Sequence, residues 1–305
     1  MKLNRLVFFT AGLIFFSACN SEKQPESDKL KVVCTTTMIT DLVKTIGGDE
    51  IIVQGLMGAG VDPHLFKASA GDVNKLVLAD LILYNGLHLE GKLVEVFEKM
   101  GAKKNTIALA DCISVEDLIH SDLFASNHDP HIWFSINNWK LISTFVSEIL
   151  QKNDSDNASK YEERYMDYMT QLEILDASSK EMIKSLPKEK RVLVTAHDAF
   201  GYFGKDFGFE VVGLQGLSTV TEAGVKDVQE LAKLIIEKDV KAIFVESSVP
   251  QRTIESLQAA VQSKGHEVVI GGTLYSDALG DYGTVEGTYI GMFEHNLKTI
   301  VNSLK

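Results

Sequence analysis

Short runs rich in β-branched residues alternate with helical patterns along most of this 305-residue chain. Strands spaced by helices favour βα units and parallel sheets, because parallel neighbours need a long crossover connection. Each half of the chain contains four such runs, at 30–35, 51–56, 79–85 and 106–109, and then at 191–195, 209–213, 241–246 and 267–270. The sequence therefore predicts an α/β protein of two lobes, each a parallel sheet of about four strands flanked by helices.

One long amphipathic helix is predicted between the two halves, over residues 155–187. Ser155 or Asp156 is expected to cap its start, and Pro187 is expected to stop it. A coiled-coil dimer is the alternative, but Ser179 interrupts the apolar seam, so we favour a rigid helix that links the lobes. The residues of the seam recur every three or four positions, at Tyr161, Tyr165, Tyr168, Leu172, Leu175, Met182 and Leu186.

The N-terminus has the pattern of a secretory signal. Lys2 and Arg5 precede an apolar stretch that is too short to remain as a spanning helix. The residues before Cys19 resemble a bacterial lipobox, in which that cysteine becomes the lipidated first residue; an ordinary cleaved signal or an uncleaved anchor is the alternative. The expected segments are a lipoprotein signal peptide at 1–18, a polar tether at 19–29, an N-terminal lobe at 30–154, the linking helix at 155–187 and a C-terminal lobe at 188–305.

The charge of the chain excludes one class of partner. The net charge is −12, and it becomes −14 once Lys2 and Arg5 are removed with residues 1–18. An acidic surface of this kind argues against binding to nucleic acid and is compatible with the handling of cations. Besides Cys19, the chain has only Cys34, which is expected in the core, and Cys112. The sequence does not decide whether these two form a disulfide.

Three histidines occupy positions suited to a metal site. The tripeptide Asp-Pro-His ends in His64 and again in His131, and proline stiffens each loop. His197 follows a predicted strand. Imidazole nitrogen combined with carboxylate oxygen suits zinc and manganese, so a carboxylate is also expected. Asp277, in a glycine-bounded segment after the last predicted strand, is the best candidate, and Glu246, at the end of another strand, is its rival.

The spacing of these candidates favours capture over catalysis. The three histidines and Asp277 follow one another at intervals of 66 to 80 residues, and no short His-Glu-x-x-His motif is present. Two ligands from each half would place an ion in the cleft between the lobes. Such a position suits the binding and release of an ion.

Six motifs in a fixed order make the chain similar to a known family. They are Asp62–His64, Tyr84–Gly91, Asp129–Trp133, Thr195–Phe203, Phe244–Pro250 and Leu274–Gly280. From about Lys31 to the C-terminus, the chain resembles the zinc and manganese group of bacterial ABC-transporter solute-binding proteins, which includes the streptococcal-adhesin-like lipoproteins. The resemblance implies two lobes joined by a rigid helix. It also implies a ligand set of His64, His131, His197 and Asp277, with Glu246 as a neighbouring residue.

The resemblance further implies an extracytoplasmic, lipid-anchored monomer, at a cell surface or in a periplasm, with a family link to cell adhesion. It would bind one Zn²⁺ or Mn²⁺ and deliver the ion to an ABC permease and its ATPase without acting as an enzyme. Residues of the 191–305 lobe would shift locally on release. His88 is expected to pack or to form hydrogen bonds near the cleft. For His120 and His128, exposure at the surface is favoured over a weak metal-collecting site.

The sequence leaves alternatives open for the metal that is bound and for the functional class of the protein. Members regarded as manganese-selective often carry Glu where this chain has His197, and the chain lacks the long His-rich loop of many zinc members. We favour zinc with manganese close behind, because zinc binds such ligands more tightly. The other classes are a zinc metalloenzyme of the cell envelope with Asp198 or Glu246 as general base, an adhesin with a structural metal, and a receptor for an organic chelate.

Overall fold

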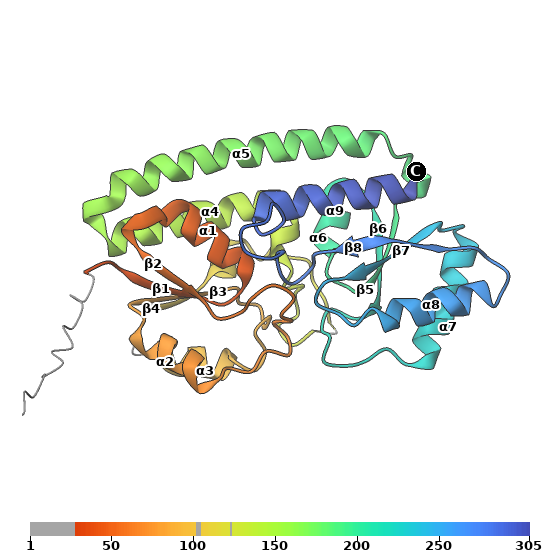
Figure 1. Ribbon diagram of the computed structural model, residues 1–305, viewed down its shortest axis with the longest axis horizontal. Coiled ribbons are helices and arrows are strands. Elements are labelled where there is room, and N and C mark those ends of the chain that lie inside the picture. The colour runs from red at the N-terminus through yellow and green to blue at the C-terminus, as the bar shows by residue number, and fades with distance from the viewer. Residues whose placement is uncertain (1–27, 102–104, 123) are drawn as a thin grey trace, which may run out of the picture.

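The computed structural model describes residues 28–101, 105–122 and 124–305. Within this part of the chain, two α/β lobes lie side by side beneath one long helix, α5 (Figure 1). The predicted fold class, two lobes of parallel strands flanked by helices, is confirmed. The expected signal peptide, most of the tether and Cys19 lie outside the described residues.

The N-terminal lobe is built on one parallel sheet with the strand order β2-β1-β3-β4. Its strands are β1 (Lys31–Cys34), β2 (Ile52–Gly55), β3 (Leu81–Tyr84) and β4 (Asn105–Ala108). Its helices are α1 (Thr37–Gly47), α2 (Ala70–Leu78), α3 (Val94–Gly101) and α4 (Ile136–Asn153). The central strands β1 and β3 are almost fully buried, since helices α1 and α4 cover one face of the sheet and α2 and α3 the other (Figure 1).

The C-terminal lobe contains two hydrogen-bonded parallel pairs, β5-β6 and β7-β8, rather than one continuous ladder. Strand β5 lies against β7, so the spatial order is β6, β5, β7, β8. The strands are β5 (Val192–His197), β6 (Glu210–Gln215), β7 (Ala242–Glu246) and β8 (Val269–Leu274). The helices are α6 (Gly201–Phe207), α7 (Val225–Glu237), α8 (Arg252–Gln262) and α9 (Tyr289–Leu304). The carboxyl ends of β5 and β7 therefore meet at one edge.

Strand β8 is longer than the sequence indicates. The predicted strand ended at Ile270, but β8 continues through Gly271 and Gly272 to Leu274. A Cβ atom on Gly271 would lie 2.7 Å from the Cβ of Ser303 on α9, so glycine here serves helix packing instead of a turn. The predicted glycine-bounded loop before Asp277 is therefore wrong in its first four residues.

Helix α5 (Ala158–Lys184) runs along the top of both lobes (Figure 1). It has 27 residues and spans roughly 40 Å at 1.5 Å per residue. It packs on α4 and α1 of the first lobe and on α9 of the second. Its buried face consists of Tyr161, Tyr168, Leu172, Leu175, Ser179 and Ile183. The helix thus connects the lobes through a continuous packed face.

Two details of this helix differ from expectation. Residues Ser155–Asn157 form a separate 3-10 turn, so neither Ser155 nor Asp156 caps α5; Asn157 precedes it without a side-chain cap hydrogen bond. Ser179 does not interrupt the packing, because it is fully buried, and Ile183 continues the buried face four residues later. A serine hydroxyl is small enough to fit such a packed seam.

One apolar cluster crosses the junction between the lobes. It includes Leu42 and Trp139 from the first lobe, Leu172 of α5, and Phe203 and Tyr289 from the second. Trp139 stacks on Tyr289 with ring centroids 4.6 Å apart. Because the interiors of proteins are close-packed, this shared core resists a wide hinge motion of one lobe against the other.

Cys34, buried in β1 as expected, and Cys112 are both free thiols. Among the described helices, none combines the length and the hydropathy needed to cross a membrane.

Candidate metal centre

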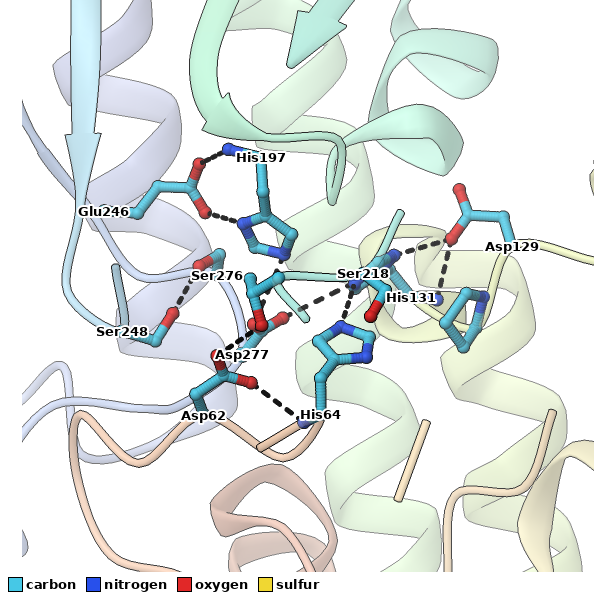
Figure 2. A network of polar contacts seen from close by, with 12 residues as sticks. Asp62, His64, Asp129, His131, His197, Ser218, Glu246, Ser248, Ser276 and Asp277 are labelled. Carbon is cyan, nitrogen blue, oxygen red and sulfur yellow. Dashed lines mark hydrogen bonds and ion pairs between the residues drawn. The ribbon is translucent and has the colours of Figure 1, made fainter. Parts of the chain in front are cut away.

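Four buried side chains from distant parts of the sequence converge at the junction of the lobes (Figure 2). Each offers one potential ligand atom, and these atoms all lie within 4.8 Å of one another. The four residues are the ones that the sequence singled out, His64, His131, His197 and Asp277. They come from the loop after β2, the residue before the 3-10 turn at 132–134, the end of β5 and the loop after β8.

The Asp-Pro-His tripeptides orient their histidines through their own aspartates. Asp62 Oδ1 accepts the backbone N–H of His64 at 2.8 Å, and Asp129 Oδ1 accepts that of His131 at 2.9 Å. Asp129 Oδ1 also lies 2.7 Å from Nδ1 of His131, so Nδ1 carries the proton and Nε2 is left to face the site (Figure 2). The other oxygen of Asp62 accepts the hydroxyl of Thr219 from the opposite lobe.

His197 is fixed in a similar way by Glu246. The backbone N–H of His197 donates to Glu246 Oε1 at 2.8 Å, and Nδ1 of the ring lies 2.6 Å from Glu246 Oε2. Nε2 of His197 then faces Asp277, at 3.2 Å from Oδ2 (Figure 2). Both carboxylate oxygens of Glu246 contact His197, so Glu246 lies next to the four-residue cluster and is not part of it.

The centre of the cluster brings together atoms that need a cation. Nε2 of His64 and Nε2 of His131 lie 3.3 Å apart, and Nε2 of His131 lies 3.5 Å from Asp277 Oδ1. Apart from these imidazoles, neither oxygen of Asp277 has a hydrogen-bond donor within the described residues. Buried polar atoms are normally satisfied, and one carboxylate and three imidazole nitrogens directed at a common point fit a divalent ion.

The electrostatics of the site differ from one histidine to the next. Burial lowers the pKa of His64 to about 3, from an ordinary value of 6.5. Burial also opposes protonation of His197, but the carboxylates of Asp277 and Glu246 outweigh it and raise the pKa of His197 well above its ordinary value. For Asp277, burial alone would raise the pKa, yet the charge of His197 lowers it below the usual carboxyl range. Without an ion, His197 therefore carries a proton that balances Asp277.

Sequence reasoning missed a buried polar network behind His131. Glu90 Oε1 accepts the hydroxyl of Thr35 and the backbone N–H of Asn85, both at 2.7 Å. The side-chain amide of Asn85 donates to the carbonyl oxygen of Pro130 at 3.0 Å. His88 is not packed as expected, because its side chain is exposed on a left-handed turn with φ of 65°. Glu90, the single acidic residue of the motif Tyr84–Gly91, was the available signal for this network.

The fold and the site together define a class of protein. Two α/β lobes joined by one long helix, with potential metal ligands where they meet, are the architecture of a helix-linked solute-binding protein. The chain belongs to the family described as zinc-uptake complex component A, periplasmic, whose model matches residues 32–303.

Relatives in this family carry names for two different metals. The chain is 49% identical over 290 residues to the zinc-binding protein TroA of Treponema pallidum, which covers 95% of this chain and 94% of the relative. It is 46% identical over 299 residues to the manganese-binding lipoprotein MntA of Bacillus subtilis (strain 168), covering 98% and 97%. The chain is therefore similar to nearly the same degree to a relative named for zinc and to a relative named for manganese.

Solved structures agree with this assignment. The periplasmic zinc-binding protein TroA from Treponema pallidum matches with a TM-score of 0.88 at 50% identity, covering 90% of this chain and 99% of that one. A Mn-bound periplasmic metal-binding protein from Candidatus Liberibacter asiaticus matches with a TM-score of 0.78 at 28% identity, covering 91% and 100%. The two-lobed fold is thus shared by proteins whose structures are named for either ion.

Proposed function

We propose that this protein is the extracytoplasmic solute-binding component of a zinc or manganese ABC importer. It captures one divalent ion with His64, His131, His197 and Asp277 and delivers the ion to a membrane permease and its ATPase. The observation that carries the proposal is the convergence of four buried ligand atoms within 4.8 Å, two from each lobe, in a chain of the zinc-uptake family.

The ligand set suits both candidate ions. Three imidazole nitrogens and one carboxylate oxygen are acceptable to zinc and to manganese, and the general order of affinities places zinc above manganese. Affinity alone does not identify the transported ion, since selectivity also depends on geometry and on metal availability. The protein is expected to bind both ions, with zinc held more tightly.

Binding without catalysis is the better interpretation of this geometry. A catalytic zinc site keeps one coordination position open for water, whereas four protein ligands close this one. Glu246 would be one general base of a metalloenzyme, but both of its oxygens contact His197. The other candidate, Asp198, borders a neighbouring cavity of about 470 Å³ beside Asp129. A hydrolase would need its base directed at a metal-bound water, so we favour a transport receptor.

The anchor and the mode of release belong to the same proposal. Cys19 is the expected lipidation site, and the similarity to the Bacillus relative, which is named as a lipoprotein, supports it. The protein acts as a monomer tethered outside the cytoplasmic membrane. Because the core is continuous across the junction, release proceeds through local movement of loops in the 191–305 lobe, where Asp277 is carried.

X-ray absorption spectroscopy of the zinc-loaded protein tests the proposed ligand set. We expect a four-coordinate ion with nitrogen and oxygen neighbours at about 2.0–2.1 Å and outer-shell scattering from imidazole rings. An Asp277→Asn variant should keep the imidazole scattering and weaken the binding. Sulfur ligands, or a shell of oxygens alone, would contradict the assignment.

A further inference from the structure

One tryptophan lies between a ligand of the first lobe and a ligand of the second. Trp133 follows His131 by two positions and is 1% exposed. Its indole ring meets the imidazole of His131 edge-on, with centroids 5.3 Å apart and an interplanar angle of 74°. Its Nε1–H donates to the carbonyl oxygen of Ser276 at 3.0 Å, across 143 positions of sequence. Ser276 directly precedes Asp277 (Figure 2).

The loop that carries Asp277 is hydrogen-bonded to the opposite lobe on both sides of that residue. Neither carboxylate oxygen of Asp277 receives a hydrogen bond from the described residues other than the clustered imidazoles, so the side chain is placed by its backbone. That backbone is held on one side by Trp133 at Ser276. On the other side, the N–H of Leu279 donates to the hydroxyl of Thr37 at 2.8 Å. Trp133 and Thr37 both belong to the N-terminal lobe. Within its own lobe, the loop is also held by Ser248, whose hydroxyl lies 3.0 Å from that of Ser276, and by Asn296, which bonds to the backbone of Tyr275.

We propose that Trp133 is a positioning residue that fixes the distance between His131 and Asp277 and thereby sets how tightly the ion is held. This inference rests on the proposed metal-binding function. An indole N–H can only donate, and the buried Ser276 carbonyl would lose this partner if the indole were removed. Groups that orient the direct ligands of a metal typically change its affinity by 10- to 100-fold when they are lost.

The chain supplies a matched control, because it contains only two tryptophans. Trp139 is also 1% exposed, and its Nε1–H donates to the hydroxyl of Tyr168 at 3.0 Å. That bond joins α4 to α5 and involves none of the four clustered residues. Trp133→Phe and Trp139→Phe therefore remove the same group and keep an aromatic ring, and they differ in whether the lost bond reaches the Asp277 loop.

Zinc affinity and the zinc dissociation rate are measured for the full chain and both variants by competition with a chromophoric chelator. We expect Trp133→Phe to bind zinc about tenfold more weakly, mainly through faster release, and Trp139→Phe to stay within about twofold of the parent. Unchanged binding in Trp133→Phe would overturn the proposal. An equal loss in both variants would assign the effect to packing and would overturn it too.

Fluorescence gives a second test that does not need Trp133→Phe to fold. In Trp139→Phe the remaining indole is Trp133, and its emission should change with zinc up to one equivalent. Trp133→Phe supplies only a supplementary control, in which the emission of the remaining Trp139 should not change with zinc. If the emission of Trp133 did not change when zinc binds, the proposed position of Trp133 beside the ion would be refuted. If the parent chain itself binds no zinc, the proposed function fails instead, so the two failures are distinguishable.

Discussion

Glu246 holds His197 by two atoms at once. One carboxylate oxygen accepts the backbone N–H of His197 at 2.8 Å, and the other lies 2.6 Å from Nδ1 of its ring. Backbone and side chain of the histidine are therefore fixed by the same acid, at the neighbouring carboxyl ends of β5 and β7. The other ring nitrogen of His197, Nε2, does not contact Glu246 and is directed at Asp277.

Glu246→Gln should weaken zinc binding by about 10- to 100-fold without unfolding the protein, because an amide cannot accept at both contacts. A competition titration with a chelator of known affinity measures the change. Glu255→Gln is the matched control, since Glu255 is exposed on α8 of the same lobe. Equal affinity in the two variants would show that Glu246 does not orient His197 for binding.

His64→Ala and His131→Ala should each remove most of the thermal stabilisation that zinc confers. For the parent protein, zinc at a hundred times its Kd adds about 2.7 kcal/mol to the free energy of unfolding. Differential scanning calorimetry with and without zinc measures the shift. His88→Asn serves as the control, because His88 is exposed and asparagine tolerates its left-handed backbone. A full melting shift in His64→Ala or His131→Ala would remove that residue from the ligand set.

Zinc binding should release a proton at neutral pH. The pKa of His197 is raised well above its ordinary value by Asp277 and Glu246, against the effect of burial, so the metal-free site holds a proton there at pH 7. Zinc needs the neutral ring, and affinity therefore falls as pH falls. His64, with a pKa of about 3, adds no competing proton near neutrality.

Calorimetric titrations at pH 7, in buffers of different ionisation enthalpy, measure the number of protons released. We expect about one proton per zinc ion and an apparent affinity that drops by up to about tenfold for each unit of pH below the pKa of His197. An affinity that stays constant between about pH 6 and pH 8, with no proton released, would contradict the protonated state of His197.

Gly213→Ala should disturb both the fold and the site. A Cβ atom at Gly213 on β6 would lie 2.3 Å from the backbone nitrogen of Asp198 and 2.5 Å from the carbonyl carbon of His197. Backbone atoms cannot move aside as a side chain does, so we expect a loss of about 1–3 kcal/mol in the free energy of unfolding, together with weaker zinc binding. Denaturant titration of the metal-free protein and zinc competition measure the two effects.

The control for this substitution is Gly58→Ala, because a Cβ atom there meets nothing within 4 Å. That variant should match the parent in both measurements. If Gly213→Ala also matched the parent, the close approach of β6 to the end of β5 would not constrain His197.

Much of the fold and the candidate ligands could be predicted because their signals are local. Alternating strand and helix patterns indicate the lobes, and the Asp-Pro-His tripeptides mark His64 and His131 through a turn that each aspartate closes. The extension of β8 through Gly271 could not be predicted from the neighbouring sequence. Glycine is needed there because Ser303 of α9, which is distant in the sequence, approaches the strand closely.

The neighbours of the candidate ligands depend on tertiary contacts that no local pattern encodes. Glu246 and Asp277 look alike from sequence, as carboxylates near strand ends, and only the adjacency of β5 and β7 turns Glu246 toward His197. The bond from Trp133 to Ser276 joins residues 143 positions apart. Its existence follows from how the lobes pack, which a single sequence does not specify.

The most direct test of capture and release is to strip the purified protein of metal with a chelator and titrate it with Zn²⁺, recording the melting temperature and the bound metal. We predict a stripped protein that remains folded on its apolar core, binds one ion per chain, melts at a higher temperature when loaded, and yields the ion again to chelator. A parallel titration with Mn²⁺ should give the same stoichiometry with weaker binding. Irreversible unfolding on stripping, or a melting temperature that neither ion raises, would contradict the proposed function.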